Sequence, residues 1–221
     1  MRVATWNVEA KTDAAAVGLL LGLRADVLLL TEVHPALQVP GYRMTELREP
    51  TMLGGQHYAA VAARNDLELV RLTPPAVTSA AARVGGITFV CSVLPWMLAT
   101  SSPYTGTTQA EQVEYAVDEL VPWLHEQGEL VWGGDWNHPL SGPLTGFTVR
   151  GRDRLLRAVD ELGLTAHTGA ELSQAGPRGR SRAIDHLASR HPQGPVDVTP
   201  GAPHSTHDAY VVELPLPRPL G

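Results

Sequence analysis

The stretch VWGGDWNH, residues 131–138, combines an apolar run, two glycines and polar side chains. The apolar residues from Leu130 to Trp132 predict a buried strand, and the glycines after them let the backbone turn without steric cost. Asp135 and Asn137 follow two positions apart, so strand geometry would direct both side chains to one face at the end of the strand. A carboxylate and a carboxamide in that position can hold a metal ion or orient an oxygen nucleophile. The alternative is an ordinary turn, because Asp and Asn are common turn residues.

The composition indicates one folded domain over residues 1–221, with a short Pro-rich tail from about residue 215. The chain is 43% hydrophobic and 18% charged, with a net charge of -6, which suffices for one substantial core. The single cysteine, Cys91, excludes an internal disulfide and favours a reducing, cytoplasmic location. The N-terminus lacks the apolar region of a signal peptide, and no apolar run is long enough to span a membrane. The acidic balance argues against a general polyanion-binding surface but leaves room for a local basic groove.

The periodicity of apolar residues predicts an α/β fold with many short strands. Helices are expected over about residues 13–24, from a capping box at Thr108 to Glu111 onward, and over 152–162. Expected strands cover residues 2–8, 26–33, 41–47, 57–64, 67–72, 86–94, 130–132, 164–167, 183–189, 196–199 and 209–214. Short loops between successive strands predict an antiparallel meander.

Polar side chains stand where several of these strands end. They are Asn7, Glu32, Asp135, Asn137, Asp185 and His207. Glu32 ends a continuous apolar run, and a charge at the inner end of a buried strand needs a partner or a metal. The alternative is that the strand has already reached solvent there.

Five sequence blocks carry a resemblance to a known family. They are ATWNVEA (4–10), LLLTEV (28–33), WGGDWNHP (132–139), AIDHLAS (183–189) and STHDAYVVEL (205–214). In this order they resemble the endonuclease/exonuclease/phosphatase superfamily, which has the deoxyribonuclease-I-like fold, and the resemblance spans residues 2–214. It implies a four-layered α/β/β/α sandwich of two packed, mostly antiparallel sheets, with the site where the strand ends meet. It also implies a hydrolase that uses Mg²⁺ or Mn²⁺ to activate water against a phosphate ester, and favours a phosphodiesterase or nuclease, with nucleic acid among the candidate substrates.

The resemblance also implies roles for individual residues. Metal binding falls to three residues: Asn7, Glu9 and Glu32. Catalysis falls to four: Asp135 prepares the attacking water, Asn137 positions phosphate and nucleophile, and Asp185 supports the catalytic histidine, His207.

Two further residues are candidates for substrate contact. His138 follows the DWN motif directly. Arg182 closes a group with Arg178 and Arg180, which offers a local phosphate-binding edge. The alternative for this group is an ordinary solvated loop.

Two positions depart from the family pattern. Thr206 stands where the family has an aspartate before the histidine, and Leu94-Pro95 stands where many members have a His or Tyr donor. The departures leave open a binding protein of the same fold with reduced or lost catalysis. A purely structural domain would leave the carboxylates at the strand ends unexplained. We expect Asp185 to supply the negative charge that Thr206 lacks.

Overall fold

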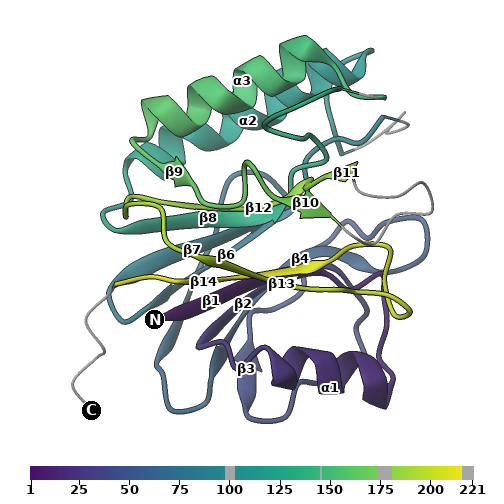
Figure 1. The fold of residues 1–221 in the computed structure, drawn as a ribbon, viewed down its shortest axis with the longest axis vertical. Coiled ribbons are helices and arrows are strands. Elements are labelled where there is room, and N and C mark those ends of the chain that lie inside the picture. Colours follow the sequence, from purple (N-terminus) through teal and green to yellow (C-terminus); the bar gives the residue numbers. More distant parts are fainter. Residues whose placement is uncertain (98–102, 145, 174–180, 216–221) are drawn as a thin grey trace.

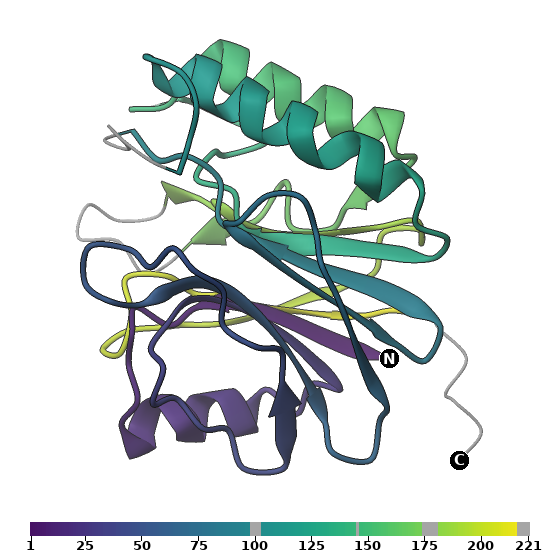
Figure 2. The same ribbon diagram turned by 180° about the vertical axis from the view of Figure 1, so that it is seen from behind.

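Two packed sheets with helices on their outer faces form the framework of the protein. The computed structural model describes residues 1–97, 103–144, 146–173 and 181–215. Each of the two main sheets has six strands. Figure 1 shows one helix, α1 (Ala14–Gly22), covering the outer face of the first sheet, while α2 (Gln109–His125) and α3 (Val149–Glu161) lie side by side over the second. Figure 2 shows the same four layers from behind. The predicted four-layered α/β/β/α sandwich is confirmed.

The first sheet has the strand order β13-β14-β1-β2-β4-β3. Its strands are β1 (Arg2–Asn7), β2 (Val27–Val33), β3 (Tyr42–Met44), β4 (His57–Arg64), β13 (Val196–Thr199) and β14 (Ala209–Glu213). β1 and β2 are parallel and are connected through α1 (Ala14–Gly22), whereas the other neighbours are antiparallel. Asp13 caps α1, since its side chain accepts hydrogen bonds from the backbone N–H groups of Ala15 and Ala16.

The second sheet has the strand order β5-β6-β7-β8-β12-β9. Its strands are β5 (Leu69–Leu72), β6 (Ser79–Val84), β7 (Ile87–Ser92), β8 (Leu130–Asp135), β9 (Thr165–Ala166) and β12 (Asp185–Ser189). β7 and β8 are parallel and are connected through α2 (Gln109–His125), and the remaining pairs are antiparallel. A separate two-stranded sheet consists of β10 (Leu172–Ser173) and β11 (Ser181–Arg182).

One of the two helices over the second sheet, α3, starts earlier than its apolar pattern predicts. α3 spans Val149–Glu161 because Thr148 acts as the N-cap and accepts a hydrogen bond from the N–H of Gly151. The capping box at the start of α2 is present as predicted, with Thr108 and Glu111 each bonding the backbone of the other.

Apolar side chains from both sheets meet between the layers. The cluster includes Val3, Leu29 and Val61 from the first sheet with Phe89 and Val131 from the second, all at most 2% exposed. Such burial contributes roughly 1.5–3 kcal/mol per large aliphatic or aromatic side chain. The core therefore holds the two sheets, and the strand ends that they carry, in a fixed relation.

The strand register brings the polar ends together. Asn7 pairs with Thr31 across β1 and β2, and Asp185 pairs with Asp135 across β12 and β8. In Figure 1 these strand ends point toward the same end of the sandwich. Within the described part of the chain, no helix combines the length and the apolar character needed to cross a membrane.

Candidate functional site

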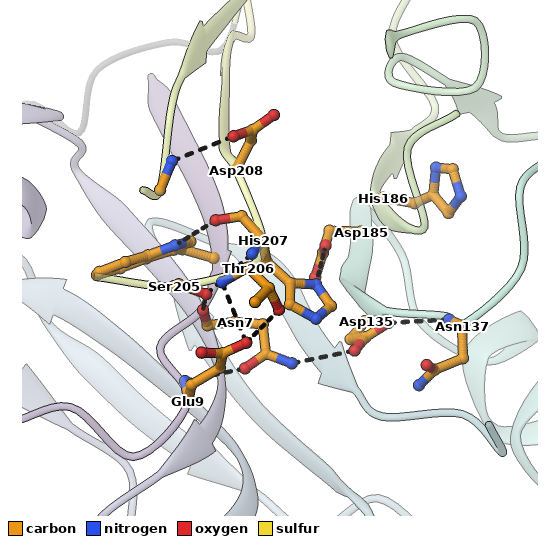
Figure 3. A network of polar contacts seen from close by, with 12 residues as sticks. Asn7, Glu9, Asp135, Asn137, Asp185, His186, Ser205, Thr206, His207 and Asp208 are labelled. Carbon is orange, nitrogen blue, oxygen red and sulfur yellow. Dashed lines mark hydrogen bonds and ion pairs between the residues drawn. The ribbon is translucent and has the colours of Figure 1, made fainter. Parts of the chain in front are cut away.

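Asn7 links the carboxylates of the two sheets. Its Nδ2 donates one hydrogen bond to Oε1 of Glu32 at 3.0 Å and another to Oδ2 of Asp135 at 3.1 Å. Figure 3 shows Asn7 on the first sheet reaching across to Asp135 on the second. The expected convergence of the strand ends is therefore present, with a fully buried amide at its centre.

Backbone strain is concentrated at this site. Among the described residues, the non-glycine residues with positive φ are Glu9, Ala10, Arg24, Glu32 and Asn137. All except Arg24 lie at the converging strand ends. Because the left-handed region is costly for L-residues, such conformations persist only where the surroundings enforce them. Here the N–H of Ala10 donates to the carbonyl of Glu32 at 2.8 Å, which fixes the backbone of both carboxylate-bearing segments.

The glycines of the central motif serve close packing rather than the predicted turn. β8 continues through Gly133 and Gly134 to Asp135, so the expected turn after Trp132 is wrong. A Cβ at Gly133 would lie 2.5 Å from the carbonyl oxygen of His186 on the neighbouring strand. Gly134 has φ +115°, which L-residues rarely adopt. A Cβ at Gly134 would lie 2.3 Å from the carbonyl oxygen of Ser92 on β7, so the two glycines let β7 and β12 approach β8 closely just before its polar end.

His207 and Asp185 form a close pair above this end. Nδ1 of His207 lies 2.6 Å from Oδ2 of Asp185. The His207 backbone is fixed on both sides, because its N–H donates to Oγ of Ser205 at 3.0 Å and its carbonyl accepts from Nε1 of Trp6 at 3.0 Å. The ring thus has a defined orientation, which Figure 3 shows between the two sheets.

The surroundings of His207 favour its charged form. Burial alone would lower the pKa of the imidazole, but the charge and the hydrogen bond of Asp185, with the charges of Asp135 and Glu32, raise it to about 10. His207 therefore carries a positive charge near neutral pH. A partly exposed imidazolium at this position can bind an anionic oxygen.

The surroundings of Asp135 favour its neutral form more than those of an exposed carboxyl group do. Its Oδ1 accepts from the N–H of Asn137 at 3.0 Å, and its Oδ2 accepts from Asn7. Burial raises the pKa of Asp135, and the nearby charge of Asp185 raises it further, while His207 and the two hydrogen bonds oppose the rise; the resulting pKa is about 7. A carboxylate with this pKa suits proton transfer near neutral pH.

Asn137 reaches the site by a turn and not by strand alternation. β8 ends at Asp135, and Asn137 has φ 52°. Its Nδ2 donates to the carbonyl of Leu94 at 2.9 Å, which orients the amide group. Leu94 itself is fully buried, so the position that lacks the family's donor contributes a backbone carbonyl instead.

Thr206 contacts a predicted metal ligand. Its backbone N–H donates to Oε1 of Glu9 at 3.1 Å, and its hydroxyl also donates to the same oxygen. The preceding Ser205 donates through Oγ to the carbonyl of Asn7 at 2.8 Å. The segment before His207 is thereby attached to the β1 end that carries Asn7 and Glu9.

The carboxylates beside Asn7 fit a hard divalent cation. Glu9 and Glu32 both have positive φ, and a backbone hydrogen bond from Ala10 to Glu32 joins the two segments. Oε2 of Glu32 also accepts from Nε2 of Gln56 at 3.4 Å. Hard cations such as Mg²⁺ prefer oxygen ligands and bind through one or two carboxylates. The carboxylate of Glu32 contacts the amide of Asn7 directly, whereas Glu9 is joined to Asn7 through its backbone N–H, which donates to Oδ1 of Asn7 at 3.0 Å.

A second cluster of possible metal ligands includes a histidine. Ligand atoms of Asp135, Asp185 and His207 lie within 4.8 Å of one another. The raised pKa of His207 disfavours metal ligation there, because a metal-bound imidazole must be neutral at its ligating nitrogen. This cluster is better suited to acid–base chemistry than to holding the ion.

His138, a predicted substrate contact, is not exposed at the surface of the site. The side chain is fully buried, and its ring packs against Phe147 with the ring centroids 5.6 Å apart. Burial lowers the pKa of His138 to about 4. It packs under the start of α3, where a Cβ at Gly151 would lie 2.6 Å from its Nε2. This burial argues against the predicted substrate contact and indicates a packing role.

Arg182 lies on β11, three positions before Asp185. Its Nη1 donates to the carbonyl of Ala170 at 2.6 Å. The other two arginines of the predicted basic group, Arg178 and Arg180, lie outside the described residues.

The sequence did not point to Gln56 or Ser205 as parts of the site. Gln56 lies just before β4 and bonds Glu32, while Ser205 bonds both Asn7 and His207. The position of Ser205 two residues before a strand-end histidine could have indicated a turn that holds the histidine. No local pattern marks Gln56, because its partner is distant in sequence.

Comparison with known proteins identifies a family. The model of the Endonuclease/Exonuclease/phosphatase family matches residues 4–217. By sequence, no functionally curated protein matches the chain.

Several solved structures share the fold. The endonuclease domain of TRAS1, a telomere-specific non-LTR retrotransposon, is 20% identical with a TM-score of 0.68, and the match covers 95% of each chain. The 3′ phosphatase NExo from Neisseria, bound to a product DNA hairpin, is 20% identical with a TM-score of 0.69, covering 98% of this chain and 100% of the other. An AP endonuclease from Archaeoglobus fulgidus is 16% identical with a TM-score of 0.68, covering 98% and 100%.

The match of the family model over nearly the whole chain and the shared fold lead to one conclusion. The chain belongs to the endonuclease/exonuclease/phosphatase family of metal-dependent phosphoric ester hydrolases.

Proposed function

We propose that the protein is a Mg²⁺- or Mn²⁺-dependent phosphodiesterase that cleaves nucleic acid by attack of an activated water. The observation that carries this proposal is the His207–Asp185 pair facing Asp135, beside the carboxylates of Glu9 and Glu32. Acid–base groups and hard oxygen ligands are the two components that phosphoester hydrolysis requires. Nucleic acid is the favoured substrate because the three solved structures named above are an endonuclease domain, a DNA-bound 3′ phosphatase and an AP endonuclease.

Each catalytic side chain has a role that its contacts support. Asp135, held by Asn7 and the N–H of Asn137, accepts the proton of the attacking water. Asn137, held by the carbonyl of Leu94, orients the phosphate and the water.

The positive charge comes from His207. As an imidazolium held by Asp185 it donates a hydrogen bond to a phosphate oxygen, where negative charge develops during the reaction. Glu32 and Glu9, with Asn7 beside them, would hold the divalent cation, which stabilises negative charge on the phosphate oxygens.

The second candidate function is binding of a phosphate compound without turnover. Thr206 favours it, because this residue brings no charge to the position before His207 and its hydroxyl donates to Glu9. The buried Leu94 adds to this, since it supplies no side-chain donor to a phosphate.

A substrate panel separates the two functions. We would assay single- and double-stranded DNA, RNA, abasic-site duplexes, small phosphodiesters and phosphomonoesters with Mg²⁺, Mn²⁺ or EDTA. The proposal expects cleavage of a nucleic-acid phosphodiester that needs either metal and stops in EDTA. Binding of these compounds without any cleavage, under either metal, would favour the second candidate.

The organisation and location of the protein belong to the same proposal. We propose one domain over residues 1–221, in which both sheets contribute to one site. A reducing, cytoplasmic compartment is supported by Cys91, which is the chain's single cysteine and is buried and unpaired.

A further inference from the structure

Two arginines converge on one glycine of the loop that follows the catalytic strand. Nη1 of Arg152, in the first turns of α3, donates to the carbonyl of Gly142 at 2.8 Å. From β11, Arg182 approaches the same residue so closely that a Cβ at Gly142 would lie 2.7 Å from its Nε. Gly142 itself has φ +71°, a conformation that favours glycine. The two guanidinium groups therefore flank a single loop residue.

Within the described part of the chain, Arg152 and Arg182 lack the carboxylate partners that two other arginines of α3 have. Arg150 bonds Glu114 through Nε at 2.7 Å, and Arg154 bonds Asp118 through Nε at 2.7 Å. Among the described residues, neither Arg152 nor Arg182 has a carboxylate oxygen within 4 Å. The segments outside the described residues contain no Asp or Glu. Neither arginine therefore forms an ion pair with an acidic side chain.

Among the described residues, the backbone contacts of the two arginines occupy only part of their hydrogen-bonding capacity. A guanidinium has five N–H donors. Arg152 places one on the carbonyl of Gly142, and Arg182 places one on the carbonyl of Ala170. A guanidinium fixed in this way retains donors for an anion, and its planar fork matches the geometry of a phosphate group.

The pair lies on the rim of the catalytic end. Gly142 follows Asn137 by five positions in the chain, and Arg182 precedes Asp185 by three. Figure 1 shows β11 at the end of the sandwich where β12 starts. Both arginines are half-buried, so part of each side chain is accessible from solvent.

We propose that Arg152 and Arg182 form a second phosphate-binding site, which binds a backbone phosphate of the nucleic-acid substrate other than the phosphate that is cleaved. The inference rests on the proposed function. It specifies a substrate with several phosphates along a chain, in preference to a small molecule with a single phosphate. Contacts to neighbouring phosphates set the register of nucleic acid on a protein without reading its sequence.

The test compares a long and a short substrate. Arg152→Gln and Arg182→Gln would be assayed with a DNA duplex of about 20 base pairs and with a bis(p-nitrophenyl) phosphate that contains one phosphodiester. Arg157→Gln is the matched control, because Arg157 is an exposed arginine farther along α3. Gly142→Ala is a second variant, which displaces Arg182 by its Cβ without removing a charge.

The proposal expects each Arg→Gln variant to raise KM for the duplex about fivefold. The effect on the small diester should be much weaker, and Arg157→Gln should behave as wild type. The slope of log KM against log salt concentration should fall by about one for each arginine removed. Gly142→Ala should raise the duplex KM in the same direction.

Failure of the inference can be distinguished from failure of the proposed function. If the wild type cleaves the duplex and neither arginine variant changes its KM or salt slope, the second phosphate site is wrong. Equal losses on both substrates would also contradict it. If the wild type cleaves nothing, the proposed function fails, and fluorescence anisotropy with the same duplex then tests the site: unchanged affinity and salt slope in both variants would overturn it.

Discussion

Nδ1 of His207 lies 2.6 Å from Oδ2 of Asp185, and the residue that precedes His207 is a threonine. Asp185 comes from β12 of the second sheet, whereas His207 lies just before β14 of the first. The contact thus joins the two sheets at the catalytic end. It places a carboxylate on the histidine although the position of Thr206 lacks one. Asp208, which follows in sequence, instead accepts from the N–H of Gly201 at 3.1 Å and lies away from the imidazole ring (Figure 3).

The first prediction concerns this pair. Asp185→Ala should lower kcat by about 10²- to 10⁴-fold, because His207 loses the partner that orients it and keeps it charged. Thr206→Asp should raise kcat little, since Asp185 already supplies the charge. The measurement is turnover together with the NMR titration of His207, whose pKa should fall in Asp185→Ala. A large gain in Thr206→Asp alongside a neutral Asp185→Ala would reverse the assignment.

The second prediction concerns the metal. Glu32→Gln should weaken Mg²⁺ or Mn²⁺ binding at least about tenfold, because the site loses a carboxylate charge while the hydrogen bond from Asn7 can remain. Glu46→Gln is the control, since Glu46 is an exposed carboxylate that bonds Arg71. Titration calorimetry with each metal measures the change. Unchanged affinity in Glu32→Gln would reject Glu32 as the main ligand.

The third prediction concerns stability at acidic pH. Burial lowers the pKa of both His138 and His186 to about 4, against an ordinary value of 6.5. Between these values the unfolded chain binds more protons than the folded one, so stability falls as the pH drops from 6.5 toward 4, by up to about 1.4 kcal/mol per pH unit for each histidine. His207 acts in the opposite range: its pKa is raised to about 10, so its contribution is full below pH 6.5 and is lost as the pH rises toward 10.

Asp135 contributes the opposite slope over this range, because its pKa is raised to about 7 and the folded protein binds more protons there than the unfolded chain. Urea unfolding of metal-free wild type and variants from pH 4.5 to 7 measures the net slope. His186→Gln should reduce it, because one buried group that binds protons on unfolding is removed. Tyr58→Phe, a change in the core without a histidine, should leave the slope as in wild type. An unaltered slope in His186→Gln would show that His186 is not held neutral in the folded protein.

The sequence predicts the parts of the site that depend on strand ends. Asn7, Glu32 and Asp135 follow apolar runs, and the order of their blocks indicates the family. Contacts between residues distant in sequence have no such pattern: Glu9 meets Thr206, and Asn137 is held by Leu94. Local composition also gives the wrong secondary structure where tertiary packing determines it. The Ala-rich β6 was not predicted, and the glycines before Asp135 extend a strand instead of ending it.

The most direct test of the central claim is the turnover of Asp135→Asn. We propose that this site hydrolyses phosphodiesters with Asp135 as the base and a divalent metal bound nearby. Cleavage of the best substrate of the panel would be measured for wild type and Asp135→Asn, with Mg²⁺ and with EDTA, beside binding of a non-cleavable phosphorothioate analogue. We predict that wild type cleaves only with metal and that Asp135→Asn loses at least about 10²-fold in kcat while it still binds the analogue. Undiminished cleavage by Asp135→Asn would contradict the account.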